Sequence, residues 1–200
     1  MSFPQTPSKP HLGGHCGITH TDSGSLDFIK ELLTSKGITN PSFLDIGCSV
    51  GWQLDLARQK GFTVNGIEGD ESIQTNPNTK CLDTIIFHDL TKNYLIKRHC
   101  PAHLVWCCEV AEHIEEQYVM NLIRTIVYNL HSSGYIVFTF CDKEGTGIHH
   151  VNIKPEKYWL QLFEKYEIIK DKKLTDELRA KSTMVREFIR ETGIVLKFKE

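Results

Sequence analysis

The sequence predicts an α/β fold in which helices cover both faces of a largely parallel sheet. Short apolar segments alternate with amphipathic ones along the chain, a pattern typical of strands joined by right-handed crossover helices. One strand candidate, "AHLVWCCEV" at 102–110, is almost wholly apolar, as expected of a strand covered on both faces. No internal repeat or long linker interrupts this alternation. We therefore expect one domain over residues 21–200, preceded by a flexible Pro- and Gly-rich arm over residues 1–20.

The strand candidates are short segments rich in apolar, β-branched and aromatic residues, and several of them end at Gly or Asp. In chain order they lie at 41–47, 62–70, 83–90, 102–110, 133–142, 167–171 and 193–199.

The helix candidates have apolar residues at helical spacing. The first covers 26–36, with Ser23 or Ser25 as its cap and Gly37 as its stop. The others cover 52–61, 115–130, 154–166 and 174–191.

The composition is that of an ordinary globular domain: 40% of the 200 residues are apolar and 24% are charged. The formal net charge is -2, so no basic excess favours binding to a polyanion. No apolar run approaches the roughly 20 residues of a membrane span, and the N-terminus does not resemble a secretory signal. The seven cysteines are not spaced as zinc pairs, and we interpret them as reduced thiols.

The segment "LDIGCSVG" places Asp45, Gly47, Cys48 and Gly51 where the first predicted strand ends. Ligands bind at this edge of a doubly wound sheet, and glycine lets the backbone approach a ligand closely. Glu68 follows Asp45 by 23 residues and ends the second predicted strand. A carboxylate there can bind both hydroxyls of a ribose. The turn and the acid together predict a site for a cofactor that contains adenosine.

The dinucleotide fingerprint G-x-G-x-x-G requires a glycine that this chain lacks, which disfavours a nicotinamide oxidoreductase. The pattern D-x-G-C-x-x-G resembles instead the first motif of class I S-adenosylmethionine-dependent methyltransferases. "IEGD", "FHDL", "LVWCCEVAEHI" and "SGYIVFTF" are similar to further motifs and a strand of that family, so the resemblance covers roughly residues 20–200. It implies a Rossmann-like three-layer sandwich with a seven-stranded, mostly parallel sheet whose last strand is antiparallel. It also implies S-adenosyl-L-methionine as the cofactor.

Carried over by motif, the resemblance assigns the cofactor to the ends of the first four strands. Asp45 and the Gly47 turn would orient the methionyl amino end, and Glu68 would hold the ribose. Thr21 and Asp22, in a segment that looks like a short lid, would cap the first helix or touch the cofactor. The residues assigned to cofactor binding are Asp45, Gly47, Cys48, Gly51, Glu68, Gly69, Asp70, Asp89, Leu90 and Glu109.

The adenine contacts implied by the resemblance have local alternatives. Gly69 and Asp70 would lie beside the adenine, but Asp70 also suits a helix N-cap. Asp89 and the backbone of Leu90 would bind the adenine edge, but Asp89 also suits a turn cap. Glu109 would lie near the sulfonium.

The segment "GTGIHHVN" at 145–152 carries two adjacent histidines. In the family this loop lies over the methyl donor, so His149 or His150 is expected to remove the acceptor proton. The side chains of neighbouring residues diverge, and the other histidine would then orient the substrate or the loop. Gly145 and Gly147 would let the segment close over a substrate.

Other candidate groups follow the fourth strand. His113 and Glu112 would serve as base or substrate ligand, or cap the helix that begins near Glu115. Tyr158 and Trp159 are expected to pack in the core. Glu109, His113, His149 and His150 are residue types that suit a divalent ion, but no tight spacing such as H-E-x-x-H is present, so we assign no metal.

Arg179 and Arg186 are seven residues apart in the last predicted helix, which would place them on one face. They would contact an anionic substrate or form a solvated surface.

The sequence thus predicts an S-adenosylmethionine-dependent O-methyltransferase that acts on a hydroxyl of a sugar, glycan or small molecule. "HHVN" followed by "P..YW" resembles polysaccharide-modifying methyltransferases, including those of large DNA viruses, so we expect a cytoplasmic enzyme of a cell or infected host. The alternatives are a nucleic-acid (cap) methyltransferase, which would need a basic groove with stacking aromatics, and a non-catalytic cofactor-binding subunit. The sequence indicates no oligomeric state.

Overall fold

The computed structural model describes residues 12, 20–97, 101–145 and 149–199. The arm predicted at 1–20 lies outside these residues except for Leu12 and His20. In the described part of the chain, no helix is both long enough and apolar enough to cross a membrane.

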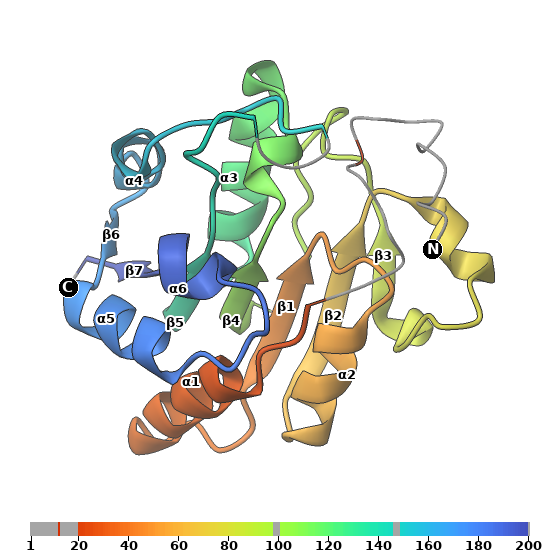
Figure 1. Cartoon of the computed structure of the whole chain (residues 1–200). Helices are drawn as coiled ribbons and strands as arrows, with labels where there is room; N and C mark the ends of the chain where they lie inside the picture. Colours follow the sequence, from red (N-terminus) through yellow and green to blue (C-terminus); the bar gives the residue numbers. More distant parts are fainter. Residues whose placement is uncertain (1–11, 13–19, 98–100, 146–148, 200) are drawn as a thin grey trace.

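The described residues form a seven-stranded sheet in the order β3-β2-β1-β4-β5-β7-β6 (Figure 1). Strand β7 runs antiparallel to both β5 and β6, and the other pairs are parallel. The predicted sheet, with its last strand antiparallel, is therefore confirmed. The strands are β1 (Ser42–Ile46), β2 (Thr63–Glu68), β3 (Ile85–Phe87), β4 (Ala102–Cys107), β5 (Leu130–Phe138), β6 (Ile168–Lys170) and β7 (Ile194–Phe198).

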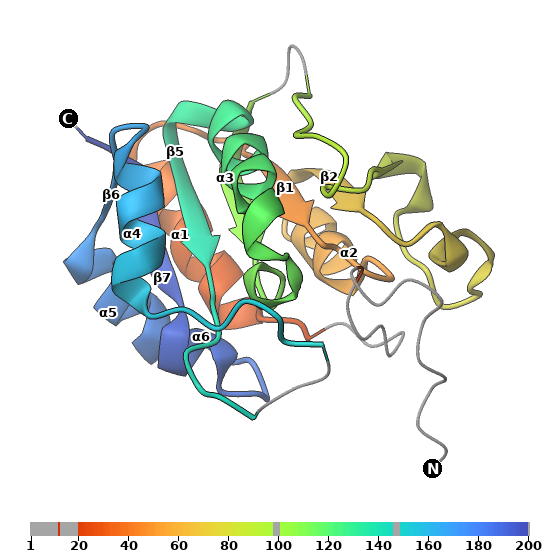
Figure 2. The same cartoon turned by 90° about the horizontal axis from the view of Figure 1, so that it is seen from above.

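Helices cover both faces of the sheet (Figure 1), and Figure 2 shows the same layers from above. One layer holds α1, α2, α5 and α6, and the opposite layer holds α3 and α4. The helices are α1 (Ser23–Ser35), α2 (Trp52–Gln59), α3 (Val119–Tyr128), α4 (Glu156–Glu164), α5 (Lys172–Lys181) and α6 (Phe188–Thr192).

Two apolar cores lie on the two faces of the sheet because side chains alternate along each strand. In β4, Leu104 and Trp106 pack with the layer of α1, and Val105 and Cys107 pack with the layer of α3. Trp159 is fully buried against the Phe138 ring, with centroids 5.3 Å apart, so its predicted core position is confirmed.

The first helix begins three residues earlier than predicted. Asp22, not Ser23 or Ser25, is its N-cap, and the Asp22 carboxylate accepts hydrogen bonds from the Ser25 backbone N–H (3.0 Å) and hydroxyl (2.7 Å). Of the two predicted roles for Asp22, the structure shows the capping role.

The predicted helix over 174–191 is wrong in its second half. Helix α5 ends at Lys181, and the chain then leaves helical geometry before α6. The Asp22 carboxylate causes the break, since it accepts hydrogen bonds from the Ser182 hydroxyl (2.5 Å) and the Thr183 N–H (2.9 Å). Arg179 and Arg186 therefore do not share a helix face.

Candidate active site

The glycine turn predicted to bind a cofactor lies at the carboxyl end of β1, which pairs with β2 on one side and β4 on the other. Gly47 has φ of 73° and Gly51 has φ of 75°, left-handed values that favour glycine. A Cβ at Gly47 would lie 2.4 Å from the Val110 side chain, and one at Gly51 would lie 2.4 Å from the Lys80 carbonyl oxygen. The turn therefore requires both glycines.

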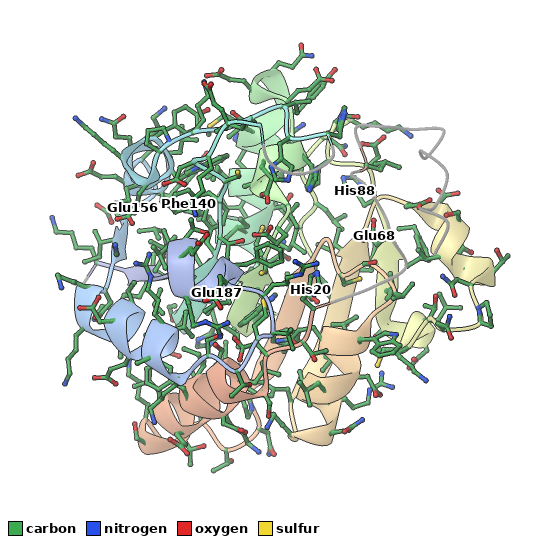
Figure 3. The ribbon with its side chains drawn as sticks, in the orientation of Figure 1. His20, Glu68, His88, Phe140, Glu156 and Glu187 are labelled. Carbon is green, nitrogen blue, oxygen red and sulfur yellow. The ribbon has the colours of Figure 1, made fainter. Side chains whose placement is uncertain are left out.

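The Glu68 carboxylate connects the turn after β1 with the turn after β2. Its Oε2 atom accepts a hydrogen bond from the Ser49 N–H (2.7 Å), and its Oε1 atom accepts one from the Asp70 N–H (3.0 Å). Figure 3 shows Glu68 at the end of β2. The acid is thus fixed at the strand end where ribose hydroxyls bind in sheets of this kind.

Asp45 is a buried acid at the end of β1, with 4% of its surface exposed. Burial, followed by the charge of Glu68, raises the pKa of Asp45 well above its ordinary value. No described residue donates a hydrogen bond to its carboxylate. A cationic ligand group bound at this edge would supply the charge partner that the ionised carboxylate lacks.

The other residues predicted to bind the cofactor divide by what their side chains contact. Cys48 is fully buried against Gly66, so only its backbone is available at the edge. Leu90 is also buried, and its carbonyl accepts a hydrogen bond from the Asn121 side chain (2.7 Å). Gly69 lies against the Leu12 side chain, which a Cβ would approach to 2.6 Å.

Asp70 and Asp89 both cap local turns. The Asp70 carboxylate accepts a hydrogen bond from the Ser72 N–H (2.9 Å) at the start of a 3₁₀ turn. The Asp89 carboxylate accepts hydrogen bonds from the Thr91 N–H (2.9 Å) and hydroxyl (2.7 Å). The local alternative for each residue is therefore present, and their cofactor contacts stay predictions.

The histidine segment is docked on the turn that follows β4. The Glu112 carbonyl accepts hydrogen bonds from the Val151 N–H (2.9 Å) and the Asn152 N–H (3.0 Å). The His113 Nδ1 atom lies 3.2 Å from the His149 carbonyl oxygen. His149 has φ of 58°, a left-handed value that is uncommon outside glycine. These contacts place the histidine segment beside Glu112 and His113 at the carboxyl end of β4.

Most of the unpaired buried polar atoms among the described residues gather at this contact. Of the seven side-chain nitrogen and oxygen atoms that are buried without a hydrogen-bond partner, six belong to Glu112, His149, His150 and Asn152. Glu112 is fully buried, and neither of its carboxylate oxygens has a hydrogen bond of good geometry. Because buried polar groups in native proteins are nearly always paired, such a group is a candidate contact for a ligand, an ion or a water molecule. Glu112 does not cap the following helix, one of its two predicted roles.

Glu109 and Glu112 form a pair of carboxyls with raised pKa values. Burial is the main cause for both, and the charge of Glu109 adds to the rise at Glu112. The Thr139 hydroxyl donates a hydrogen bond to the Glu109 carboxylate (3.0 Å) and opposes the rise there. The two carboxyls can hydrogen-bond to each other only when one is protonated, so the pair holds either a proton or another cation.

Three of the predicted acceptor-side residues come together. His113 and His150 have ring centroids 4.9 Å apart at an angle of 85°. One ligand atom each of Glu112, His113 and His150 lies within 4.8 Å of the others. Burial lowers the pKa of His150, which keeps its imidazole neutral near pH 7.

The chain matches the model of a known protein family over most of its length. The methyltransferase-domain family matches residues 20–179. The chain belongs to this family. It is therefore an S-adenosylmethionine-dependent methyltransferase, and no curated protein matches it significantly.

Solved methyltransferases share the fold at low sequence identity. The sugar N-methyltransferase KedS8 from Streptoalloteichus has a TM-score of 0.62 and 14% identity, over 88% of this chain and 87% of that one. A TehB-like methyltransferase from Corynebacterium glutamicum has a TM-score of 0.58 and 16% identity, over 88% of each chain. Magnesium protoporphyrin IX methyltransferase from Synechocystis, with bound S-adenosylmethionine, has a TM-score of 0.53 and 15% identity, over 87% of this chain and 77% of that one.

The residues at the carboxyl edge fit S-adenosylmethionine, the cofactor of this methyltransferase. The cofactor carries an ammonium group and a sulfonium, and the unpaired Asp45 carboxylate suits the ammonium group. Glu68 suits the ribose, and Gly47 adds no side chain of its own where β1 ends.

Two residues at the site were missed from the sequence. His20 packs edge-on against the Phe188 ring, with centroids 5.3 Å apart, and burial and then the charge of Arg186 lower its pKa. Asn152 is buried beside the histidines with both side-chain polar atoms unpaired. The only sequence signal for either was its place in a polar segment next to a strand or helix end.

Proposed function

We propose that this methyltransferase transfers the methyl group to a hydroxyl of a sugar, glycan or other small molecule. The observation that carries the proposal is the group of histidines and buried acids beside the cofactor edge, in which burial lowers the pKa of His150. Asp45 on β1 pairs in register with Trp106 on β4, and Glu109 and Glu112 follow β4. The cofactor edge and the histidine segment are therefore neighbours.

A hydroxyl acceptor must lose its proton as it reacts. S-adenosylmethionine supplies a methyl group on a sulfonium: the acceptor oxygen forms the new C–O bond while the C–S electron pair stays on sulfur. The chain then has to align the acceptor and hold its proton. We assign the proton to His149 or His150, both of which have a buried, unpaired nitrogen.

A second candidate acceptor is an amine on a sugar. KedS8, which shares the fold, is a sugar N-methyltransferase. An amine can react from its neutral form and needs a base less. Nucleic acid is a weaker candidate because the net charge of -2 includes no basic excess. A cytoplasmic location stays a prediction.

The first test is cofactor binding by calorimetry. We expect the chain to bind S-adenosylmethionine and not NAD. Glu68→Ala should weaken binding by about 1 to 3 kcal/mol, the scale of lost hydrogen bonds to a charged group. The matched control is Glu71→Ala, an exposed acid three residues later, which should leave affinity unchanged. Binding of NAD alone would overturn the assignment.

The second test is a panel of acceptors read by mass spectrometry. We expect methylation of sugars, at oxygen, and none of RNA caps or peptides. Replacing the histidine that acts as base with Ala should lower turnover by about 10² to 10⁴-fold, the usual effect of losing a general base. The affinity for S-adenosylmethionine should barely change. Near-normal turnover in both His149→Ala and His150→Ala would exclude them as the base and favour an amine acceptor.

A further inference from the structure

The turn after β4 and the histidine segment, residues 149–152, together present a set of side chains that can bind a metal ion. It combines a buried carboxylate, Glu112, with two imidazoles, His113 and His150, whose ligand atoms lie within 4.8 Å of one another. Two atoms bound to one cation at about 2.1 Å lie about 3 to 4.2 Å apart, depending on geometry. Small side-chain rotations would therefore bring all three groups onto one ion.

Glu112 supplies an independent observation. Its side chain is fully buried, and neither oxygen has a hydrogen bond of good geometry, although its own N–H and the Glu109 carboxyl lie near it. A buried carboxylate without a well-aligned donor is costly, whereas the same carboxylate on a cation is fully paired. The nearby Glu109 adds a second negative charge, so a divalent cation would neutralise the pair.

The tautomer of His113 also suits a ligand role. Its Nδ1 atom faces the His149 carbonyl oxygen at 3.2 Å, and a carbonyl can only accept a hydrogen bond. Nδ1 therefore carries the hydrogen of this contact, which makes Nε2 the ring atom that would bind a cation. Metal-bound histidines are commonly oriented in this way, with the second ring nitrogen donating to a carbonyl or carboxylate.

We propose that Glu112, His113 and His150 bind one divalent transition-metal ion whose open positions receive the acceptor oxygen. Two imidazoles favour a transition-metal ion such as Fe²⁺ or Zn²⁺ over Mg²⁺ and Ca²⁺, which prefer oxygen ligands, and the carboxylate also suits Mn²⁺. Three protein ligands leave positions open for a substrate. That the ion receives the acceptor oxygen rests on the proposed function. Because His150 is then a metal ligand, His149 is the histidine that takes the acceptor proton.

The spacing of the ligands explains why the sequence analysis assigned no metal. Glu112 and His113 are neighbours in the chain, but His150 follows them on a loop 37 residues later. Only the docking of the Val151 and Asn152 backbones on the Glu112 carbonyl brings the third ligand to them.

Mn²⁺ binding to the metal-free full-length chain tests the proposal, read by the loss of the free-ion electron paramagnetic resonance signal. Mn²⁺ is the suitable probe because it has little affinity for the thiols of this cysteine-rich chain. We expect one site. Glu112→Gln and His150→Ala should each weaken it roughly tenfold or more. The matched control is His131→Ala, a half-buried histidine at the start of β5, which should leave Mn²⁺ affinity unchanged.

Two further measurements separate the possible failures. Glu112→Gln should melt at or above the wild-type temperature without metal, because it removes a buried carboxylate, and Mn²⁺ should raise the melting temperature of the wild type alone. S-adenosylmethionine affinity is measured in parallel. The metal site is overturned if the chain binds the cofactor but not Mn²⁺, or if neither Glu112→Gln nor His150→Ala changes Mn²⁺ affinity. Either result leaves the proposed function standing. Absence of cofactor binding overturns the proposed function itself.

Discussion

Single residues at the site are predictable when one backbone or charge requirement decides them. The positions of Gly47 in a turn and Glu68 at a strand end were predictable because the sheet fixes both, while their cofactor contacts stay predictions. Cys48 lies in the same turn, but its side chain packs in the core. Glu112 shows the limit: its burial without a partner depends on a loop that docks from elsewhere in the chain. No local pattern in the sequence contains that information.

Asp45 offers a test of function against stability. A carboxyl whose pKa is raised by folding holds its proton more tightly in the folded chain than in the unfolded one. The contribution of Asp45 to the free energy of unfolding is therefore fully present below its ordinary pKa of 3.8. That contribution is lost as the pH rises through the higher pKa of the folded chain. Asp45→Asn cannot ionise, so it should raise the melting temperature, and by more at pH 7 than at pH 4. It should also weaken S-adenosylmethionine binding by roughly tenfold through loss of the proposed contact with the ammonium group.

Thermal melts at the two pH values and calorimetry measure both effects. Asp83→Asn, at an exposed acid, is the control and should change neither property. A variant that is less stable at pH 7 than the wild type would show that the buried carboxylate has a stabilising partner.

At the scale of elements, all seven strands were predicted, because each strand carries its own apolar signal. The last helix was not, since its break at Ser182 depends on Asp22, 160 residues away. Helix periodicity continues through 182–187, and the local sequence carries no stop signal strong enough to show the break. The missed contact joins the start of α1 to the segment between α5 and α6.

Asp22 therefore stabilises two elements at once. It is fully buried and accepts hydrogen bonds from Ser25, Ser182 and Thr183. We expect Asp22→Ala to lower the free energy of unfolding by about 3 kcal/mol or more, because several buried donors lose their acceptor. Asp171 is the N-cap of α5, and its carboxylate accepts one backbone hydrogen bond, from the Leu174 N–H. Asp171→Ala should lower the free energy of unfolding by about 1 kcal/mol.

Urea unfolding of the two variants measures the difference. Equal losses in both would show that Asp22 acts as an ordinary helix cap and does not join the two segments.

At the scale of the whole molecule, charge decides between classes of acceptor. The chain has 23 basic and 25 acidic residues, and many of the basic ones are paired on the surface, as Lys172 is with Asp176 and Arg190 with Glu187. A polyanionic acceptor would have to be held by several unpaired Lys or Arg side chains. A small neutral acceptor would be held by hydrogen bonds and burial, which salt hardly screens.

The salt dependence of kcat/KM therefore separates the two classes before the acceptor is identified in detail. For a sugar or other neutral small molecule we expect less than about a twofold change between 50 and 200 mM salt. A nucleic acid held through 6–10 phosphates would lose about 10³ to 10⁵-fold in affinity over the same range. The measurement uses the best acceptor from the panel, with S-adenosylmethionine saturating at both salt concentrations. A steep loss would contradict the sugar assignment and favour a polyanion.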